Sequence, residues 1–225
     1  VALALLHAGW RGDVLGRMER SGAAGAFAEP ELGVLLRMLD AGVNAPWTTS
    51  MGRLFDATAS LLGIAQRVTF EGEAAMALEW AVDMHETGAY SIPVVRVAGG
   101  DDESPAAADA CDGAAACLLE LDWRPAVEEL LADRAAGVGV PVAAARFHNG
   151  LVNAIAQVAE RVGEERVALT GGCFQNRVLL ERATARLSAL GFEPLLHRQV
   201  PANDGGLALG QVAVAAARLG GVQGR

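Results

Sequence analysis

The stretch RVALTGGCFQNRVLLE, residues 166–181, decides the fold of this chain. An apolar run typical of a short strand ends at Gly171 and Gly172, and the pattern of an amphipathic helix begins a few residues later. Paired glycines let the backbone turn sharply and leave its amide groups open to a ligand. A helix N-terminus adds unpaired N–H donors and a partial positive charge. The loop therefore suits an adenylate phosphate or the polar face of a nucleoside.

Asn176 and Cys173 are the two side chains in this loop that can carry chemistry. Asn176 stands at the start of the predicted helix, where asparagine either caps the helix or exchanges hydrogen bonds with a ligand. Cys173 is a candidate nucleophile, because a helix N-terminus lowers the pKa of a thiol. No histidine lies nearby in the sequence, however, and a buried cysteine commonly serves as a small hydrophobic residue. We therefore expect no catalytic role for Cys173.

Helices and strands alternate on both sides of the glycine loop. The periodicity predicts a helix over 142–163, a strand over 166–170, a helix over about 177–190, a strand over 193–197 and a last helix over 207–219. This alternation predicts an α/β layer with at least partly parallel strands.

A second loop, PANDGG, precedes the last helix and also follows a predicted strand. Its Asp204 is either a helix N-cap, a turn former or an oxygen ligand to a metal. Two such loops at the carboxyl ends of neighbouring strands are where open α/β sheets bind nucleotides and metals. The pair of loops is therefore stronger evidence for a site than either loop alone.

The first part of the chain, about 1–141, is predicted to be mainly helical, and about 142–225 forms the α/β part. Asp56 lies inside a predicted helix, where aspartate has poor helix propensity, so it is either buried against a ligand hydroxyl or on the surface. The patterns predict helices at 1–8, 31–39, 50–62, 70–88 and from Pro125 onward. The helix at 50–62 is capped by Thr49 or Ser50 and stopped by Gly63, and the helix at 70–88 ends at Gly88. A strand is predicted at 90–97 and an exposed polar connection at 99–113.

Composition excludes several classes of protein. The 225 residues, 52% hydrophobic and 20% charged, are enough for one sizeable core or two small ones. A net charge of −9 disfavours nonspecific nucleic-acid binding. Three cysteines without a CxxC pair favour a reducing compartment, the cytoplasm by default. No apolar stretch reaches the roughly 18–20 residues of a membrane span.

The histidines do not form a metal site by local spacing, because neither HxxxH nor HExxH occurs in the sequence. His148 lies in RFHNGL near the start of the long predicted helix. A lone helical histidine is more often packed or capping than a metal ligand.

Five ordered motifs closely resemble the carboxy-terminal, TsaD-like region of the HypF family of hydrogenase maturation carbamoyltransferases: TTSMGRLFDATASLLGI, FEGEAAMALE, FHNGL, LTGGCFQNRVLLE and NDGGLALGQ. The resemblance covers nearly the whole chain. It implies the second lobe of an actin-like and Hsp70-ATPase-like (ASKHA) fold with additional helices, incomplete relative to the family. It also implies carbamoyl transfer from ATP-derived carbamoyl adenylate to the C-terminal cysteine of a HypE-like acceptor protein during [NiFe] hydrogenase maturation.

The resemblance also assigns site residues. It implies that Asp56 contacts the ribose, that Gly72 lies beside the nucleoside, and that the nucleotide is held by Gly171, Gly172 and Asn176. Asp204 matches the carboxylate that completes a site for a divalent metal, zinc or iron. The resemblance gives no catalytic residue and no role for Glu71 or His148.

The family's two metal-binding histidines, in an HxxxH motif on the first lobe, lie upstream of everything in this sequence. Because Val1 opens inside a helical pattern, we expect a carboxy-terminal piece that lacks the first lobe. Its partner would be the missing amino-terminal part of the same enzyme, and alone it would be inactive or nearly so. Two alternatives stay open: carbamoyl transfer to a small-molecule hydroxyl, and a noncatalytic lobe that serves as an interaction surface.

Overall fold

The computed structural model describes residues 1–23, 25–97 and 118–222. Its helices and strands follow one another in this order: α1 (Ala2–Gly9), η1 (Arg11–Asp13), α2 (Val14–Glu19), α3 (Glu29–Asp40), α4 (Met51–Leu61), α5 (Glu73–Trp80), β1 (Val94–Val97), β2 (Leu118–Leu121), α6 (Arg124–Ala135), α7 (Val140–Val162), β3 (Arg166–Leu169), η3 (Gly172–Gln175), α8 (Arg177–Ala189), β4 (Glu193–Leu196), η4 (Asp204–Gly206) and α9 (Leu207–Val222).

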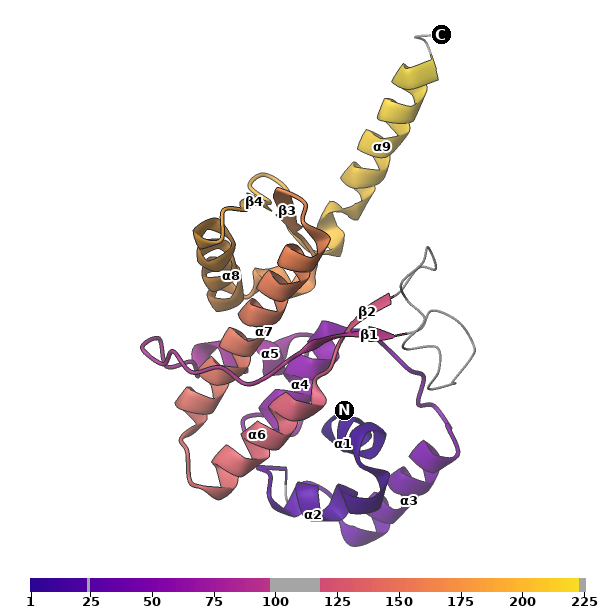
Figure 1. Cartoon of the computed structure of the whole chain (residues 1–225). Coiled ribbons are helices and arrows are strands. Elements are labelled where there is room, and N and C mark those ends of the chain that lie inside the picture. The colour runs from indigo at the N-terminus through magenta and orange to yellow at the C-terminus, as the bar shows by residue number, and fades with distance from the viewer. Residues whose placement is uncertain (24, 98–117, 223–225) are drawn as a thin grey trace.

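The long helix α7 connects the two parts of the molecule (Figure 1). Its first half runs beside α6, and its second half packs against α8. Pro141 stands in its first turn, where the missing proline N–H costs no hydrogen bond. The helices α1 to α6 lie around one end of α7, and β3, β4 and α8 lie around the other.

The structure contains two small two-stranded sheets, one parallel and one antiparallel. β3 pairs with β4 in parallel, with Arg166 opposite Glu193, so the predicted parallel pairing after the long helix is confirmed. β1 pairs with β2 in the antiparallel direction, with Val94 opposite Leu121. β2 was not expected from the sequence, and it adds a hairpin-like sheet to the part of the chain that was predicted to be mainly helical.

The helix α4 supplies much of the core. Leu54, Phe55, Thr58 and the flanking Leu62 are buried, and Met51 packs against the core. The ring of Phe55 meets Phe147 of α7 edge to face, with centroids 5.1 Å apart. Such pairs contribute about 0.5–1.5 kcal/mol beyond the apolar area that they bury.

The predicted helix over 70–88 is wrong in its second half, because α5 ends at Trp80. Two hydrogen bonds direct the following segment elsewhere. The backbone N–H of Asp83 donates to the carbonyl of Pro141 at 3.0 Å, and the carboxylate of Asp83 accepts from the N–H of His85 at 2.9 Å. Gly88 does not end a helix, and its N–H donates to the carboxylate of Glu86. These contacts compete with helical hydrogen bonds.

The remaining predicted helices and strands are confirmed, with shifts of a few residues at their ends. The predicted polar connection at 99–113 lies outside the described residues, and so do Cys111 and Cys117.

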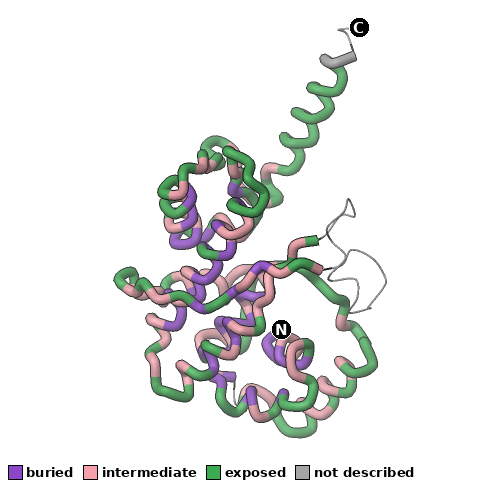
Figure 2. The backbone as a smooth tube through the Cα atoms, viewed as in Figure 1, coloured by how far each residue is buried: buried purple, intermediate pink, exposed green. Residues whose placement is uncertain are grey.

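The last helix, α9, projects away from the rest of the molecule (Figure 1). Its described side chains are exposed along its length, as Figure 2 shows. The exposed side chains include Leu207, Leu209, Val212, Val214 and Leu219. A helix that is apolar on all sides is normally buried. Within the described residues, no helix is long and apolar enough to cross a membrane.

Candidate functional site

The glycine loop has the backbone geometry that its sequence requires. Gly171 has φ +105° and ψ 159°, a combination that is essentially restricted to glycine. The chain turns there from β3 into η3, and the N–H of Phe174 donates to the carbonyl of Gly171 at 3.0 Å. Gly172 is exposed, and a Cβ atom added to it would meet nothing within 4 Å. The loop is therefore fixed in shape but open on the side of Gly172.

The two loops that were predicted to be neighbours are joined directly. The N–H of Gly171 donates to the carbonyl of Ala202 at 2.8 Å. A second contact links His197, at the end of β4, to Thr170 through Nε2 and Oγ1 at 2.9 Å. Asp204 therefore follows a segment that is tied to the glycine loop, at the carboxyl ends of two parallel strands.

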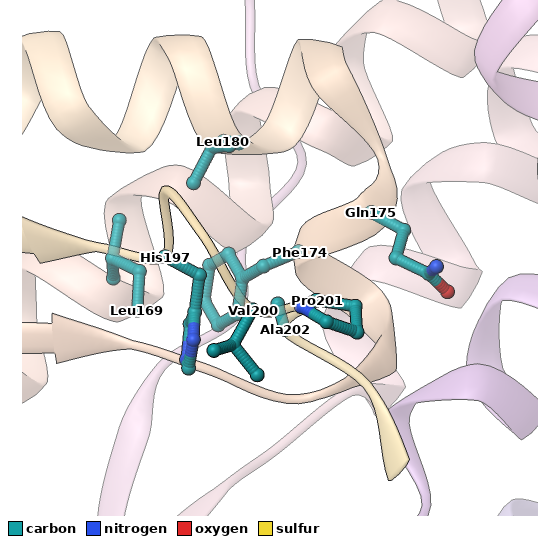
Figure 3. A pocket seen from close by; sticks show the side chains of 8 residues that line it. All are labelled: Leu169, Phe174, Gln175, Leu180, His197, Val200, Pro201 and Ala202. Carbon is teal, nitrogen blue, oxygen red and sulfur yellow. The ribbon is translucent and has the colours of Figure 1, made fainter. Parts of the chain in front are cut away.

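A small apolar cavity lies beneath the joined loops (Figure 3). Its volume is 210 Å³. It is lined by Leu169, Phe174, Gln175, Leu180, His197, Val200, Pro201 and Ala202. Pockets for small organic ligands usually measure roughly 300–1,000 Å³, so this cavity is too small for a whole nucleotide. A nucleotide would have to lie against the open face of the loop.

The expectation that α8 offers unpaired N–H donors is wrong for two positions in its first turn. Asn176 caps the helix, with Oδ1 accepting from the N–H of Leu179 at 2.8 Å. Glu79 of α5 accepts from the N–H of Arg177 at 2.7 Å. Among the described residues, the N–H groups of Gly172 and Cys173 donate to no other residue. An anionic ligand would therefore meet the loop amides more readily than the first turn of α8.

His148 is completely buried behind Asn176. Its ring lies in hydrogen-bond contact with the carbonyl of Ala144, at 2.8 Å from Nδ1, and with Nδ2 of Asn176, at 2.9 Å from Nε2. Burial is the largest cause that lowers the pKa of His148; the hydrogen bond to the Ala144 carbonyl raises it and the positive charge of Arg182 lowers it, and together these effects bring the pKa to about 4. The imidazole is therefore neutral at neutral pH.

The other predicted site residues are less closely gathered. Asp56 lies on α4, which contacts η3, and its side chain is 24% exposed with Oδ2 at 3.1 Å from Nη1 of Arg53. Gly72 precedes α5 with φ +84° and open space around it. It lies at the opposite end of α5 from Glu79, about 10 Å away along the helix axis.

Asp204 is exposed at the first position of η4, and it is not the N-cap of that turn. Asn203 takes that position, with Oδ1 accepting from the N–H of Gly205 at 3.1 Å. In the described part of the chain, no group of three or more His, Cys, Asp or Glu side chains can hold a metal ion. Asp204 alone does not form a metal site.

Cys173 is half-buried, and burial raises the pKa of its thiol. A raised pKa lowers the thiolate fraction at neutral pH, which is unfavourable for a nucleophile. Cys173 packs against the core, and the expectation that it has no catalytic role stays a prediction.

Asn149 and Gly150, which were not singled out from the sequence, hold α7 against the segment that follows α5, and Asn149 also contacts α8. Asn149 donates from Nδ2 to the carbonyls of Glu86 and Gly88, at 3.2 and 2.7 Å, and its Oδ1 accepts from Arg182. At Gly150, an added Cβ would lie 2.4 Å from the carbonyl oxygen of Tyr90. An Asn-Gly pair inside a helix is an unfavourable choice for helix propensity, and that signal identifies both positions.

Comparison with known proteins decides the family. A family profile described as "Carbamoyltransferase, Kae1-like Domain, second subdomain" matches residues 1–211. The chain belongs to this family. The expected α/β fold, an ASKHA-type second lobe with additional helices, is confirmed by this match and by similarity to solved HypF structures.

Individual relatives agree with the profile. Carbamoyltransferase HypF of Synechocystis sp. is 38% identical over 177 residues, which cover 79% of this chain and 21% of that protein. Carbamoyltransferase HypF2 of Cupriavidus necator is 38% identical over 233 residues, which cover 97% of this chain and 27% of that protein. A crystal structure described as "full-length HypF in the phosphate- and nucleotide-bound form" has a TM-score of 0.77 and 30% identity, covering 97% of this chain and 27% of its own. The chain spans about a quarter of the length of these relatives.

Proposed function

We propose that this chain is part of a HypF-type enzyme that transfers a carbamoyl group from carbamoyl adenylate to the C-terminal cysteine of a HypE-like acceptor during [NiFe] hydrogenase maturation. The observation that carries the proposal is the hydrogen bond from Gly171 to Ala202, which joins two loops at the carboxyl ends of parallel strands. This is the position where α/β sheets bind nucleotides. A related HypF structure was solved in a phosphate- and nucleotide-bound form.

The adenylate would lie against the open face of the glycine loop. The amides of Gly172 and Cys173 would donate to its phosphate, because oriented backbone N–H groups form an anion-binding concavity. Gly171 supplies the turn, Asp56 would accept from the ribose hydroxyls, and Gly72 would leave room for the nucleoside. Asn176 keeps one lone pair and one N–H beyond its internal hydrogen bonds, so a ligand contact is compatible with its capping role.

Transfer itself requires little covalent chemistry from this chain. The acceptor thiolate attacks the carbamoyl carbon, a C–S bond forms, the C–O bond to the adenylate phosphate breaks, and AMP leaves with the electron pair. The loop amides would stabilise the negative charge on the departing phosphate. Cys173 has no part in this scheme.

A divalent metal, zinc or iron, fits the proposal only in part. Asp204 would supply one oxygen ligand from the exposed start of η4. The described residues form no complete metal site. By resemblance to the family, the other ligands would come from the first lobe, outside this chain. A bound metal would act as a Lewis acid toward the carbamoyl oxygen.

The missing amino-terminal part of the same enzyme is the proposed partner of α9. This helix exposes apolar side chains, and β4 exposes Leu195 and Leu196 in a two-stranded parallel sheet. Parallel sheets are normally covered on both faces. The same exposed surface also favours the alternative of a noncatalytic lobe that acts through binding alone.

A transfer assay separates these functions. The longest polypeptide that the gene encodes would be incubated with ATP, a carbamoyl donor and either a peptide ending in cysteine or a sugar-like alcohol. We expect the peptide to gain the mass of one carbamoyl group, and Gly172→Val to reduce the rate by at least about tenfold by filling the open space above the amides. Gly33→Ala on α3 serves as the control. Carbamoylation of the alcohol alone would replace the proposed acceptor, and no transfer to either would leave the binding-only alternative.

A further inference from the structure

The buried pair of His148 and Asn176 connects α7 to the glycine loop. His148 has no exposed surface, and its ring meets Phe55 and Phe147 edge to face at 5.5 and 5.8 Å between centroids. Asn176 is also buried, and it lies between η3 and α8. Its N–H donates to the carbonyl of Cys173, and its own carbonyl accepts from Leu180. The backbone of Asn176 therefore joins the glycine loop to the first turn of α8.

Hydrogen-bond logic fixes the state of both side chains. The carbonyl of Ala144 can only accept, so Nδ1 of His148 must carry the hydrogen and donate. In the neutral ring, Nε2 is then an acceptor, and it requires the amide nitrogen of Asn176 as its donor. That orientation turns Oδ1 of Asn176 toward the N–H of Leu179, which needs an acceptor. Each group has the partner that it needs, and a flipped amide would lose both bonds.

Two other roles for His148 do not fit these contacts. A proton-transfer role requires contact with a ligand, and the ring is completely buried. A metal-ligand role requires a free ring nitrogen, and both nitrogens already have protein partners among the described residues.

We propose that His148 is a positioning residue for the nucleotide loop, because it holds the carboxamide of Asn176 in the one orientation that caps α8 where the loop ends. This inference rests on the proposed function, because it assumes that the loop binds an adenylate. A packing histidine without this role would contribute to stability but not to the shape of the loop.

Three variants of the longest polypeptide that the gene encodes test the proposal. His148→Leu removes the acceptor for Asn176, and His148→Gln can restore an acceptor. Phe147→Leu is the matched control, because Phe147 is a buried neighbour on α7 that makes no hydrogen bond to Asn176. For each variant, the melting temperature, the dissociation constant for AMP and the hydrogen-exchange rate of the Leu179 amide would be measured.

We expect His148→Leu to weaken AMP binding and speed exchange at Leu179, each by about tenfold, the factor for one lost buried hydrogen bond. His148→Gln should recover most of both, and Phe147→Leu should change neither despite a comparable loss of melting temperature. The proposal is overturned if His148→Leu leaves both within twofold of the wild type, or if Phe147→Leu matches its losses. If the wild type binds no AMP, the proposed function fails, and exchange at Leu179 alone decides whether His148 positions the loop.

Discussion

The N–H of Gly171 donates to the carbonyl of Ala202 at 2.8 Å, and this hydrogen bond joins two loops that are 31 residues apart in the chain. One loop begins at the end of β3, and the other follows β4, its parallel neighbour. Gly171 makes this bond from a backbone conformation that favours glycine, and the neighbouring Gly172 is open to solvent. The shape of the candidate nucleotide site therefore depends on a backbone contact and not on a reactive side chain.

Gly171→Ala should be much more damaging than Gly172→Ala. At Gly171 the alanine would be forced into a region that costs roughly 1–3 kcal/mol. At Gly172 the added methyl group enters open space, and the free energy of unfolding should change by less than about 0.5 kcal/mol. Urea unfolding of both variants measures the difference. Equal effects would show that the strained turn is not needed.

Gly150→Ala should destabilise the protein by about 1–3 kcal/mol, because the new methyl group overlaps the backbone of Tyr90. The carbonyl oxygen of Tyr90 would lie 2.4 Å from the added Cβ, and Tyr90 is itself held by a hydrogen bond from its N–H to Arg146. Gly33→Ala, a matched change in the exposed helix α3, should instead stabilise by up to about 1 kcal/mol. Thermal unfolding checks both signs, and a neutral Gly150→Ala would refute the close approach.

His148 should make stability depend on pH. Its folded pKa of about 4 lies below the ordinary histidine value of 6.5, so the unfolded chain binds the proton first as the pH falls. The contribution of His148 is complete above pH 6.5, and it is lost as the pH falls toward 4, by up to about 3 kcal/mol. Other groups also titrate in this range, so the relevant measurement is the difference in unfolding free energy between the wild type and His148→Gln. A difference that does not change with pH would contradict a buried neutral histidine.

Asn176→Asp should raise the pKa of His148. One carboxylate oxygen can still cap α8 through Leu179, but the other replaces the amide donor and faces Nε2. Two acceptors repel each other unless the imidazole gains a proton, and the negative charge favours the charged ring. An NMR titration of the His148 ring should therefore show a pKa above the wild-type value. An unchanged pKa would mean that Asn176 does not face the ring.

Local patterns predicted β3, the glycine loop and α8, because each is specified by residues that are adjacent in the sequence. The pairing of β3 with β4 followed from the alternation of helices and strands. The early end of α5 could not be predicted from local sequence, because the N–H of Asp83 donates to the carbonyl of Pro141, which lies 58 residues later. Strand β2 was not predicted either, because it is stabilised by antiparallel pairing with β1, which lies far away in the sequence.

In the candidate site, too, local motifs were predicted from the sequence and contacts between distant residues were not. Gly171, Gly172 and Asn176 were visible as a motif, and so was the loop that contains Asp204. The contact of Glu79 with the N–H of Arg177 joins residues 98 positions apart, and the contact of His148 with Asn176 joins residues 28 positions apart. Such contacts come from the packing of α5 and α7 against α8, and no local pattern encodes them. They turned a predicted free helix N-terminus into one whose donors are largely satisfied.

The most direct test is an NMR titration with AMP of the longest polypeptide that the gene encodes, with labelled backbone amides. The account predicts that the signals of Gly172 and Cys173 shift in a saturable way, while those of Arg177 and Leu179, whose N–H groups already donate to Glu79 and Asn176, change little. Shifts confined to Arg177 and Leu179, or no shift at saturating AMP, would contradict the claim that the open glycine loop holds the adenylate.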